Sequence, residues 1–434
     1  MKRGKAGLAC RRFKGRHTHD SIASELDNIN SSYGLSFKIT ATVTDNGSNF
    51  VKAFQVYQAT PDSDDSEEGE DDSTFVSVGD VLQSSADNVD DAISLPPHQR
   101  CASHTLNLIS CTDVDKWLFS KPETKAIYRS ATTKCAGLWN KASRSTVAAE
   151  IVDDIIAKKL LVPCTTRWNS YYDALERISK IPLVDLNTLS STLQLKCFNE
   201  REHQCIREYC AVMNPLSVAL DILQGEENCF YGTLLPTLES LMTKTLEVKN
   251  GLQILVGLPD AVIQAVKTRF APVLECEDAF LAAVTLPKFK VRWLHGQDRK
   301  DAAKASLLAE CRKLLPEQEQ LKPGTSTTNT TQRPGFSKED EFFSFMENEE
   351  DTYATAEAEV AEYLKSAATG IDILNQFPMI KKLSLKLNAA TPSSAPVERL
   401  FSLGNLILSP KRNRLSDQKF EKLLLLRYNH WFDN

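Results

Sequence analysis

The sequence predicts an α/β fold whose core is interrupted by a large all-helical insertion and resumed near the C-terminus. Apolar and polar residues alternate over residues 37–43, which is the period of a half-buried strand. Helical periodicity then dominates from residue 101 to about residue 315. We therefore expect residues 1–99 to hold the N-terminal part of the core, residues 100–375 the helical insertion, and residues 376–434 the C-terminal part.

The N-terminal region combines short strand and helix patterns. Residues 8–13 are predicted to form a short strand, and residues 18–29 an amphipathic helix with one apolar face. After the strand at residues 37–43, the pair Asn46-Gly47 favours a turn, and Ser48 is placed to cap the next helix. This order of elements, with a strand, a turn and a helix in succession, is typical of α/β proteins.

The remainder of the chain alternates long helices with two segments that are poor in apolar residues. Residues 60–74 are nearly all acidic or small polar, and they predict a solvated loop. Residues 212–223 and 234–241 carry apolar side chains at helical spacing. Residues 316–338 predict a second flexible segment, and residues 353–368 an alanine- and glutamate-rich helix that leads into the C-terminal part.

Composition limits the class of protein. No apolar run of the 434 residues approaches the roughly 20 residues that a membrane-spanning helix needs. The 11 cysteines are odd in number and show no repeated spacing, which favours reduced thiols over a disulfide framework. The net charge of −6 disfavours nucleic acid, but basic residues are concentrated in the first 16 positions and form a local basic patch. A cytosolic or nuclear protein without membrane partners is expected.

Two carboxylates from opposite ends of the chain are candidates for one site. Asp45 follows the predicted strand of residues 37–43, at a sheet edge where α/β folds often bind ligands. Glu398 follows Pro396 in the first turn of a predicted helix. Each residue also has a simpler explanation, because an Asp before Asn-Gly builds a turn and a Glu in a first turn complements the helix dipole.

The motifs around these carboxylates recur in one protein family. Asp45-Asn46-Gly47-Ser48-Asn49 matches its Asp-Asn-[Ala/Gly/Ser]-x-Asn motif, and residues 395–402 match Ser-x-x-Glu-Arg-x-Phe-Ser with Ala395 in place of the leading Ser. Further matches follow in order at His17-Thr18, at residues 101–108 and at residues 166–170. With these motifs the chain resembles the hAT transposase superfamily, and residues 378–431 resemble its C-terminal dimerisation region.

The resemblance implies a ribonuclease-H-like core and assigns roles to individual residues. In the family, two Asp and one Glu hold a pair of Mg²⁺ ions that cut and join DNA, and Asp45 and Glu398 match two of these ligands. Arg167 and Trp168 match a pair that acts on DNA ends, where an aromatic face can stack on an unpaired base. A buried Trp beside a surface Arg is the alternative. The remaining family-motif positions are His17, Cys101, His104 and Arg399.

The family's first catalytic Asp lies well upstream of its His-Thr motif. Only 16 residues precede His17 here and none is acidic, so we expect an incomplete core, at most weak metal binding, no cofactor and no nuclease activity. The zinc finger that usually precedes the domain is also expected to be absent. Cys101 and His104 have Cys-x-x-His spacing, but no matching pair of ligands is evident, so packed side chains are favoured over a zinc site.

The last predicted helix is apolar on more than one side, and such a helix must be buried on more than one side. The residues that the resemblance assigns to dimerisation are Phe420, Leu423, Leu424 and Trp431, with burial against the chain's own helices as the alternative. The sequence therefore predicts a domesticated, inactive hAT transposase derivative that is nuclear, homodimeric and a candidate for DNA association. A fragment of an active transposase is the second hypothesis, and a helical scaffold with an acidic interaction loop is the third.

Overall fold

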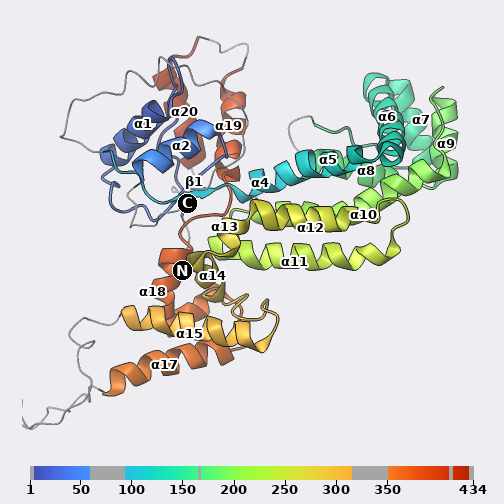
Figure 1. Ribbon diagram of the computed structural model, residues 1–434. Coiled ribbons are helices and arrows are strands. Elements are labelled where there is room, and N and C mark those ends of the chain that lie inside the picture. The colour runs from blue at the N-terminus through green and yellow to red at the C-terminus, as the bar shows by residue number, and fades with distance from the viewer. Residues whose placement is uncertain (1–3, 59–92, 165–167, 315–349, 410–413, 430–434) are drawn as a thin grey trace, which may run out of the picture. The chain divides into compact units, whose positions relative to one another are not determined.

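The computed structural model describes residues 4–58, 93–164, 168–314, 350–409 and 414–429, and it divides the chain into two compact units (Figure 1). The helical unit comprises residues 102–392, and the split unit comprises residues 4–101 together with residues 393–434. The predicted acidic loop at residues 60–74 and the predicted flexible segment at residues 316–338 lie outside the described residues. No helix within the described ranges is long and apolar enough to cross a bilayer.

The first helix of the split unit forms where the sequence predicts it. Helix α1 spans His19–Ser32, and the hydroxyl of its N-cap residue, Thr18, accepts a hydrogen bond from the backbone N–H of Ser21 at 3.3 Å. Its Ile22 is buried against helix α2, which spans Ser48–Tyr57. Gly47, not Ser48, is the N-cap residue of α2, so the predicted cap is wrong by one position.

Only a short parallel strand pair is present in the described part of the split unit. Strand β1 spans Thr42–Thr44 and pairs with β2, His98–Arg100, in the register Thr42 to His98. The prediction of a strand from residue 37 is wrong for residues 37–41. There the N–H of Lys38 bonds to the carbonyl of Leu35 in a turn, and Phe37 is 99% exposed. The protein is thus mainly helical, and the α/β prediction holds only in the loose sense that a small parallel sheet is present.

Residues 8–13 do not form the predicted strand, and side chains of distant elements bond to backbone groups in and beside this segment. The Asn429 amide both accepts from the N–H of Gly7 at 2.7 Å and donates to the Gly7 carbonyl at 2.8 Å. The N–H of Cys10 donates to Glu421 at 2.9 Å. Both partners belong to helix α20, Asp417–Asn429, so this segment packs along a helix and needs no partner strand.

Helix α20 packs beside helix α19, Ala395–Ile407, in the split unit (Figure 1). Pro396 occupies the first turn of α19, where a missing N–H costs nothing. Leu400, Ile407 and Leu424 form the buried contact between the two helices. A Cβ at Gly404 would lie 3.1 Å from the ring of Phe420, so a small residue is needed at this crossing.

The helical unit contains one strand-free array of helices in its described residues. Its N-terminal helices are α4 Ala102–Leu108, the π-helix η1 Ile109–Asp113, α5 Val114–Ser120, α6 Pro122–Arg144, α7 Thr146–Ile156, α8 Trp168–Ser179 and α9 Leu183–Thr192. Its central helices are α10 Glu200–Leu223, the 3₁₀ turns η2 Tyr231–Thr233 and η3 Val248–Gly251, α11 Leu234–Glu247, α12 Leu258–Arg269 and α13 Ala271–Leu274. Helices α14 Glu277–Val284, α15 Gln297–Lys313, α17 Glu350–Lys365, η5 Ile371–Gln376 and α18 Pro378–Leu387 complete it.

Helix α10 is the central element of the larger core, and it packs against α6, α8 and α11. The apolar positions that predicted the helix at residues 212–223 are buried, as are those of residues 234–241 in α11, which confirms both predictions. In Figure 1, α10, α11 and α12 run alongside one another. Because so many faces of α10 are covered, its polar residues must find partners inside the protein.

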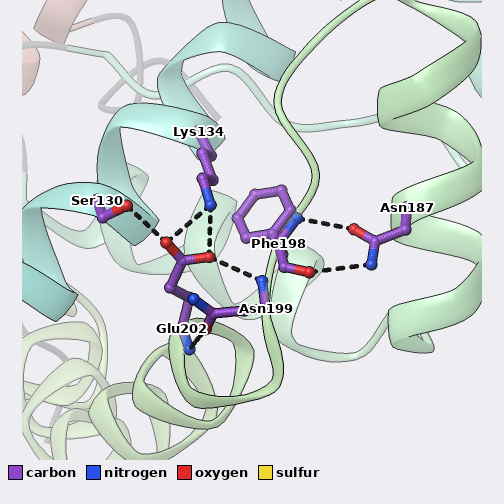
Figure 2. A network of polar contacts seen from close by, with 6 residues as sticks. All are labelled: Ser130, Lys134, Asn187, Phe198, Asn199 and Glu202. Carbon is purple, nitrogen blue, oxygen red and sulfur yellow. Dashed lines mark hydrogen bonds and ion pairs between the residues drawn. The ribbon is translucent and has the colours of Figure 1, made fainter.

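A network at the start of α10 supplies several of those partners (Figure 2). Glu202 receives the Lys134 ammonium at 2.6 Å and the Ser130 hydroxyl at 2.5 Å, both from α6. It also accepts from the backbone N–H of Asn199, whose side chain in turn accepts from the N–H of Glu202, in a capping box. These hydrogen bonds, led by that of Lys134, lower the pKa of Glu202 against the opposing effect of burial. The network therefore fixes α10 against α6.

The second core of the helical unit is formed by helices α14, α15, α17 and α18. Lys290 is 1% exposed and donates to the carbonyls of Tyr363 and Ser366 at the end of α17, at 2.7 and 2.5 Å. Helix α18 was assigned from sequence to the C-terminal part beginning at residue 376, but it packs here. The boundary between the two units lies at residue 393.

Candidate functional site

The candidate carboxylate Asp45 lies directly after strand β1 and is exposed. Its Oδ1 accepts a hydrogen bond from the backbone N–H of Gly47 at 3.4 Å, which is the turn contact that Asp-Asn-Gly sequences make. The simpler explanation of this residue is therefore realised in the structure, since Asp45 shapes the turn between β1 and α2.

His98 lies beside this turn and was missed by the sequence reasoning. Its Nε2 is 2.8 Å from the hydroxyl of Thr44, and that hydroxyl donates to the carbonyl of Asp45 at 2.8 Å. The ring stacks on Phe54 with centroids 4.4 Å apart. Burial, and to a lesser extent the positive Arg100, lower the pKa of His98 to about 4.

Cys101 links the end of β1 to the start of α19 within the split unit. The backbone N–H of Cys101 donates to the carbonyl of Thr44 at 3.0 Å. Its buried Sγ accepts from the N–H of Ser394 at 3.3 Å and lies 3.7 Å from the hydroxyl of Ser393. The Ser393 hydroxyl accepts from the N–H of Ala395, the first residue of α19. Two segments that are 293 residues apart in sequence are thus joined by one thiol.

Glu398 lies in the first turn of α19, and its carboxylate is exposed, as is the neighbouring Arg399. Among the described residues, no group of three or more His, Cys, Asp and Glu side chains is placed to hold a metal ion. A pair of Mg²⁺ ions needs more carboxylate ligands than Asp45 and Glu398 provide. Among the described residues, the donor set therefore does not fit the two-metal arrangement that the resemblance implies.

Two of the sequence motifs meet at the start of α1. The Asn49 amide donates to the backbone carbonyl of His17 at 2.7 Å, and Thr18 caps the helix. The ring of His17 contacts that of Phe13, with centroids 5.2 Å apart. In this structure the His-Thr motif and the last residue of the Asp-Asn-Gly-Ser-Asn motif hold α1 and α2 together.

Cys101 and His104 do not gather a set of metal ligands in the part of the chain that is described. Cys101 is buried and bonded to Ser394, whereas the side chain of His104 is exposed. The packed arrangement predicted from the sequence is therefore found for Cys101 and not for His104.

Trp168 is part of the protein core, and this corrects its assignment to DNA contact. The residue is 6% exposed, and its indole N–H donates to the hydroxyl of Tyr209 at 3.2 Å. Its ring also packs against Tyr172, with centroids 5.5 Å apart. A ring enclosed in this way offers no face to an unpaired base. Arg167 lies outside the described residues.

The residues predicted for dimerisation divide into two groups. Leu424 is fully buried between α19 and α20, and Phe420 packs against the same contact, so both serve the chain's own core. Leu423 is 41% exposed, and the neighbouring Leu426 is 72% exposed. Trp431 lies outside the described residues.

Comparison with known proteins identifies no relative that would assign a role to these residues. No family model matches the chain, and a search of curated proteins finds no match.

Proposed function

We propose that this chain is a domesticated derivative of an hAT-type transposase that acts in the nucleus by pairing with a second copy of itself. The observation that supports self-association is the apolar surface left uncovered on α19 and α20. The large apolar side chains that are exposed on these two helices are Val397, Phe401, Leu406, Leu408, Leu423 and Leu426. Exposed apolar side chains concentrated in this way mark interaction surfaces in soluble proteins.

The spacing of these residues supports a helix-mediated contact. Val397, Phe401 and Leu408 recur along one stripe of α19 and its C-cap, and Leu423 and Leu426 are three residues apart on α20. The opposite side of α20 is already occupied by Leu424 and by the segment around Gly7. A second copy of α19 and α20 would cover the remaining apolar faces.

Two features support a ribonuclease-H-like origin for the split unit. The strands β1 and β2 are parallel, with α1 and α2 packed on each other in the same unit. Cys101 bonds to Thr44 at the end of β1 and to Ser394 just before α19. Asp45 directly follows β1, and Glu398 lies in the first turn of α19. DNA is the second candidate partner of this unit, and the exposed basic side chains of Lys14 and Arg16 support it.

We expect the replacement of both Phe401 and Leu426 with aspartate to convert a dimer into a soluble monomer. Each substitution places an unpaired charge in the apolar contact and weakens the association by several kcal/mol. The two losses together are enough to dissociate a dimer of micromolar affinity. Sedimentation equilibrium at micromolar concentration measures the change. Both side chains are more than half exposed in the single chain, so the circular dichroism spectrum should be unchanged.

Val184 provides the matched control, because it is 76% exposed on α9 in the helical unit. Val184→Asp should remain a dimer. A monomeric wild type, or a dimer that survives the double substitution, would refute the proposed association. Leu424→Asp is unsuitable for this test because it places a charge inside the chain's own core.

For DNA cleavage we expect a negative result from this 434-residue chain. The family's chemistry requires three carboxylates to position two metal ions, and only Asp45 and Glu398 have counterparts here. The test incubates the chain with Mg²⁺ or Mn²⁺ and DNA that carries terminal inverted repeats, and it follows nicking on a gel. Cleavage that Glu398→Gln abolishes would favour the second hypothesis, a fragment of an active transposase.

A further inference from the structure

A cleft of about 690 Å³ lies between α8 and α10 in the helical unit. Tyr172 and Glu176 of α8, followed by Lys180, line one side at helical spacing. His203, Arg207 and Asn214 line the other side along one stripe of α10. The cleft contains polar and charged groups that neither the core packing nor the proposed association uses.

Arg207 is the charge that this cleft leaves uncompensated. It is exposed and makes no hydrogen bond or ion pair with any described residue. Glu176, the carboxylate of the cleft, is already paired with the Lys180 ammonium at 2.9 Å and accepts from the Tyr172 hydroxyl at 3.4 Å. The cleft therefore carries a net positive charge next to an apolar wall that includes Ile181 and Pro182.

His203 is the second side chain of the cleft whose hydrogen bonding is incomplete among the described residues. The residue is 9% exposed, and its Nε2 is buried without a hydrogen-bond partner among the described residues. We assign the ring proton to Nδ1, because Nε2 has no partner among the described residues and the ring lies beside the backbone of Ile181. Burial first, and then the charge of Arg207, lower the pKa of the ring. A neutral ring with its proton on Nδ1 presents a lone pair at Nε2, which requires a donor.

We propose that this cleft binds small phosphomonoesters in their singly protonated form. The guanidinium of Arg207 pairs with the phosphoryl oxygens, because Arg matches phosphate with two parallel N–H donors. The P–O–H group of the ligand donates to Nε2 of His203. The organic part of the ligand lies against Ile181 and Pro182. Binding of this kind does not depend on self-association through α19 and α20.

The comparison of phenyl phosphate with phenyl sulfate tests both contacts. The two probes share the ring and an anionic head, but at pH 6 only the phosphate carries a proton for a substantial fraction of the time. We expect isothermal titration of the full chain at pH 6 to show phenyl phosphate binding at least about tenfold more tightly than phenyl sulfate. His203→Leu should remove this preference while it leaves the weaker binding of phenyl sulfate.

Arg207→Gln should weaken the binding of phenyl phosphate by about tenfold or more, since a charge-assisted contact to the phosphate is lost. Arg201→Gln, another exposed arginine of the same helix outside the cleft, is the matched control and should bind like wild type. The proposal is overturned if the wild type shows no saturable binding, or if the two arginine variants weaken it equally. Because Arg207 is exposed, its variant remains a valid test even if His203→Leu fails to fold.

Discussion

Replacing Glu208 with alanine is expected to lower the free energy of unfolding of the helical unit by about 3–5 kcal/mol. The side chain is 4% exposed and accepts backbone hydrogen bonds from Gln253, Ile254 and Leu255 at 2.9, 2.8 and 2.8 Å. Alanine would remove the acceptor of three N–H groups, of which that of Leu255 is buried and those of Gln253 and Ile254 are partly buried. Each such group costs about 1–3 kcal/mol when it is buried and unsatisfied.

Urea denaturation of the full chain, followed by circular dichroism, measures this loss as a lower midpoint. Glu247→Ala is the matched control, because Glu247 is exposed at the end of α11 and should change stability by less than about 0.5 kcal/mol. A loss below about 1 kcal/mol in Glu208→Ala would mean that water replaces the carboxylate at these three amides. The assigned role of Glu208, which is to hold the segment before α12 against α10, would then be wrong.

Gly232→Ala is the second substitution with a large expected effect, and we predict a loss of about 3 kcal/mol or more. A Cβ at this position would lie 2.2 Å from the carbonyl oxygen and 2.4 Å from the carbonyl carbon of Ala282. Both atoms belong to the backbone of α14, so a side-chain rotation cannot relieve the clash. The N–H of Gly232 also donates to Asn388 at 2.8 Å, and the Asn388 amide donates to the carbonyl of Ala282 at 3.1 Å.

The same denaturation experiment measures this effect, with Gly251→Ala as its control. Gly251 lies at the end of η3, and a Cβ added there would meet no atom within 4 Å. Alanine there should be neutral or slightly stabilising, because it restricts the unfolded chain. Equal stability of the two variants would show that η2 and α14 are not held at the distance that the structure gives.

The helical unit was predicted well because its long helices repeat the same local signal many times. The apolar positions of α10 and α11 are buried as their spacing indicates. A helix makes its backbone hydrogen bonds within one segment, so its periodicity can be read from that segment alone. The helix predicted at residues 18–29 corresponds to α1, His19–Ser32, for the same reason.

Strands and sites were predicted less well because their partners are distant in sequence. Residues 8–13 have a strand-like pattern, but the N–H of Cys10 donates to the side chain of Glu421 and the carbonyl of Leu8 accepts from the Tyr33 hydroxyl. Trp168 belongs to a motif that suggested DNA contact, but Tyr209 and Tyr172 enclose it. His98 could not be selected from the sequence, because its contacts are with Thr44 on β1 and Phe54 on α2, both more than 40 positions away in the chain.

The sequence by itself determined the helices, the interruption of one unit by another, and the two carboxylate motifs at opposite ends of the chain. Only the tertiary structure decided that Cys101 joins those ends, that Leu424 is internal while Leu423 and Leu426 are exposed, and that His203 and Arg207 share a cleft. The reason is physical. Local periodicity fixes which residues share a face of a helix, but which faces are covered depends on contacts between segments that are far apart in the chain.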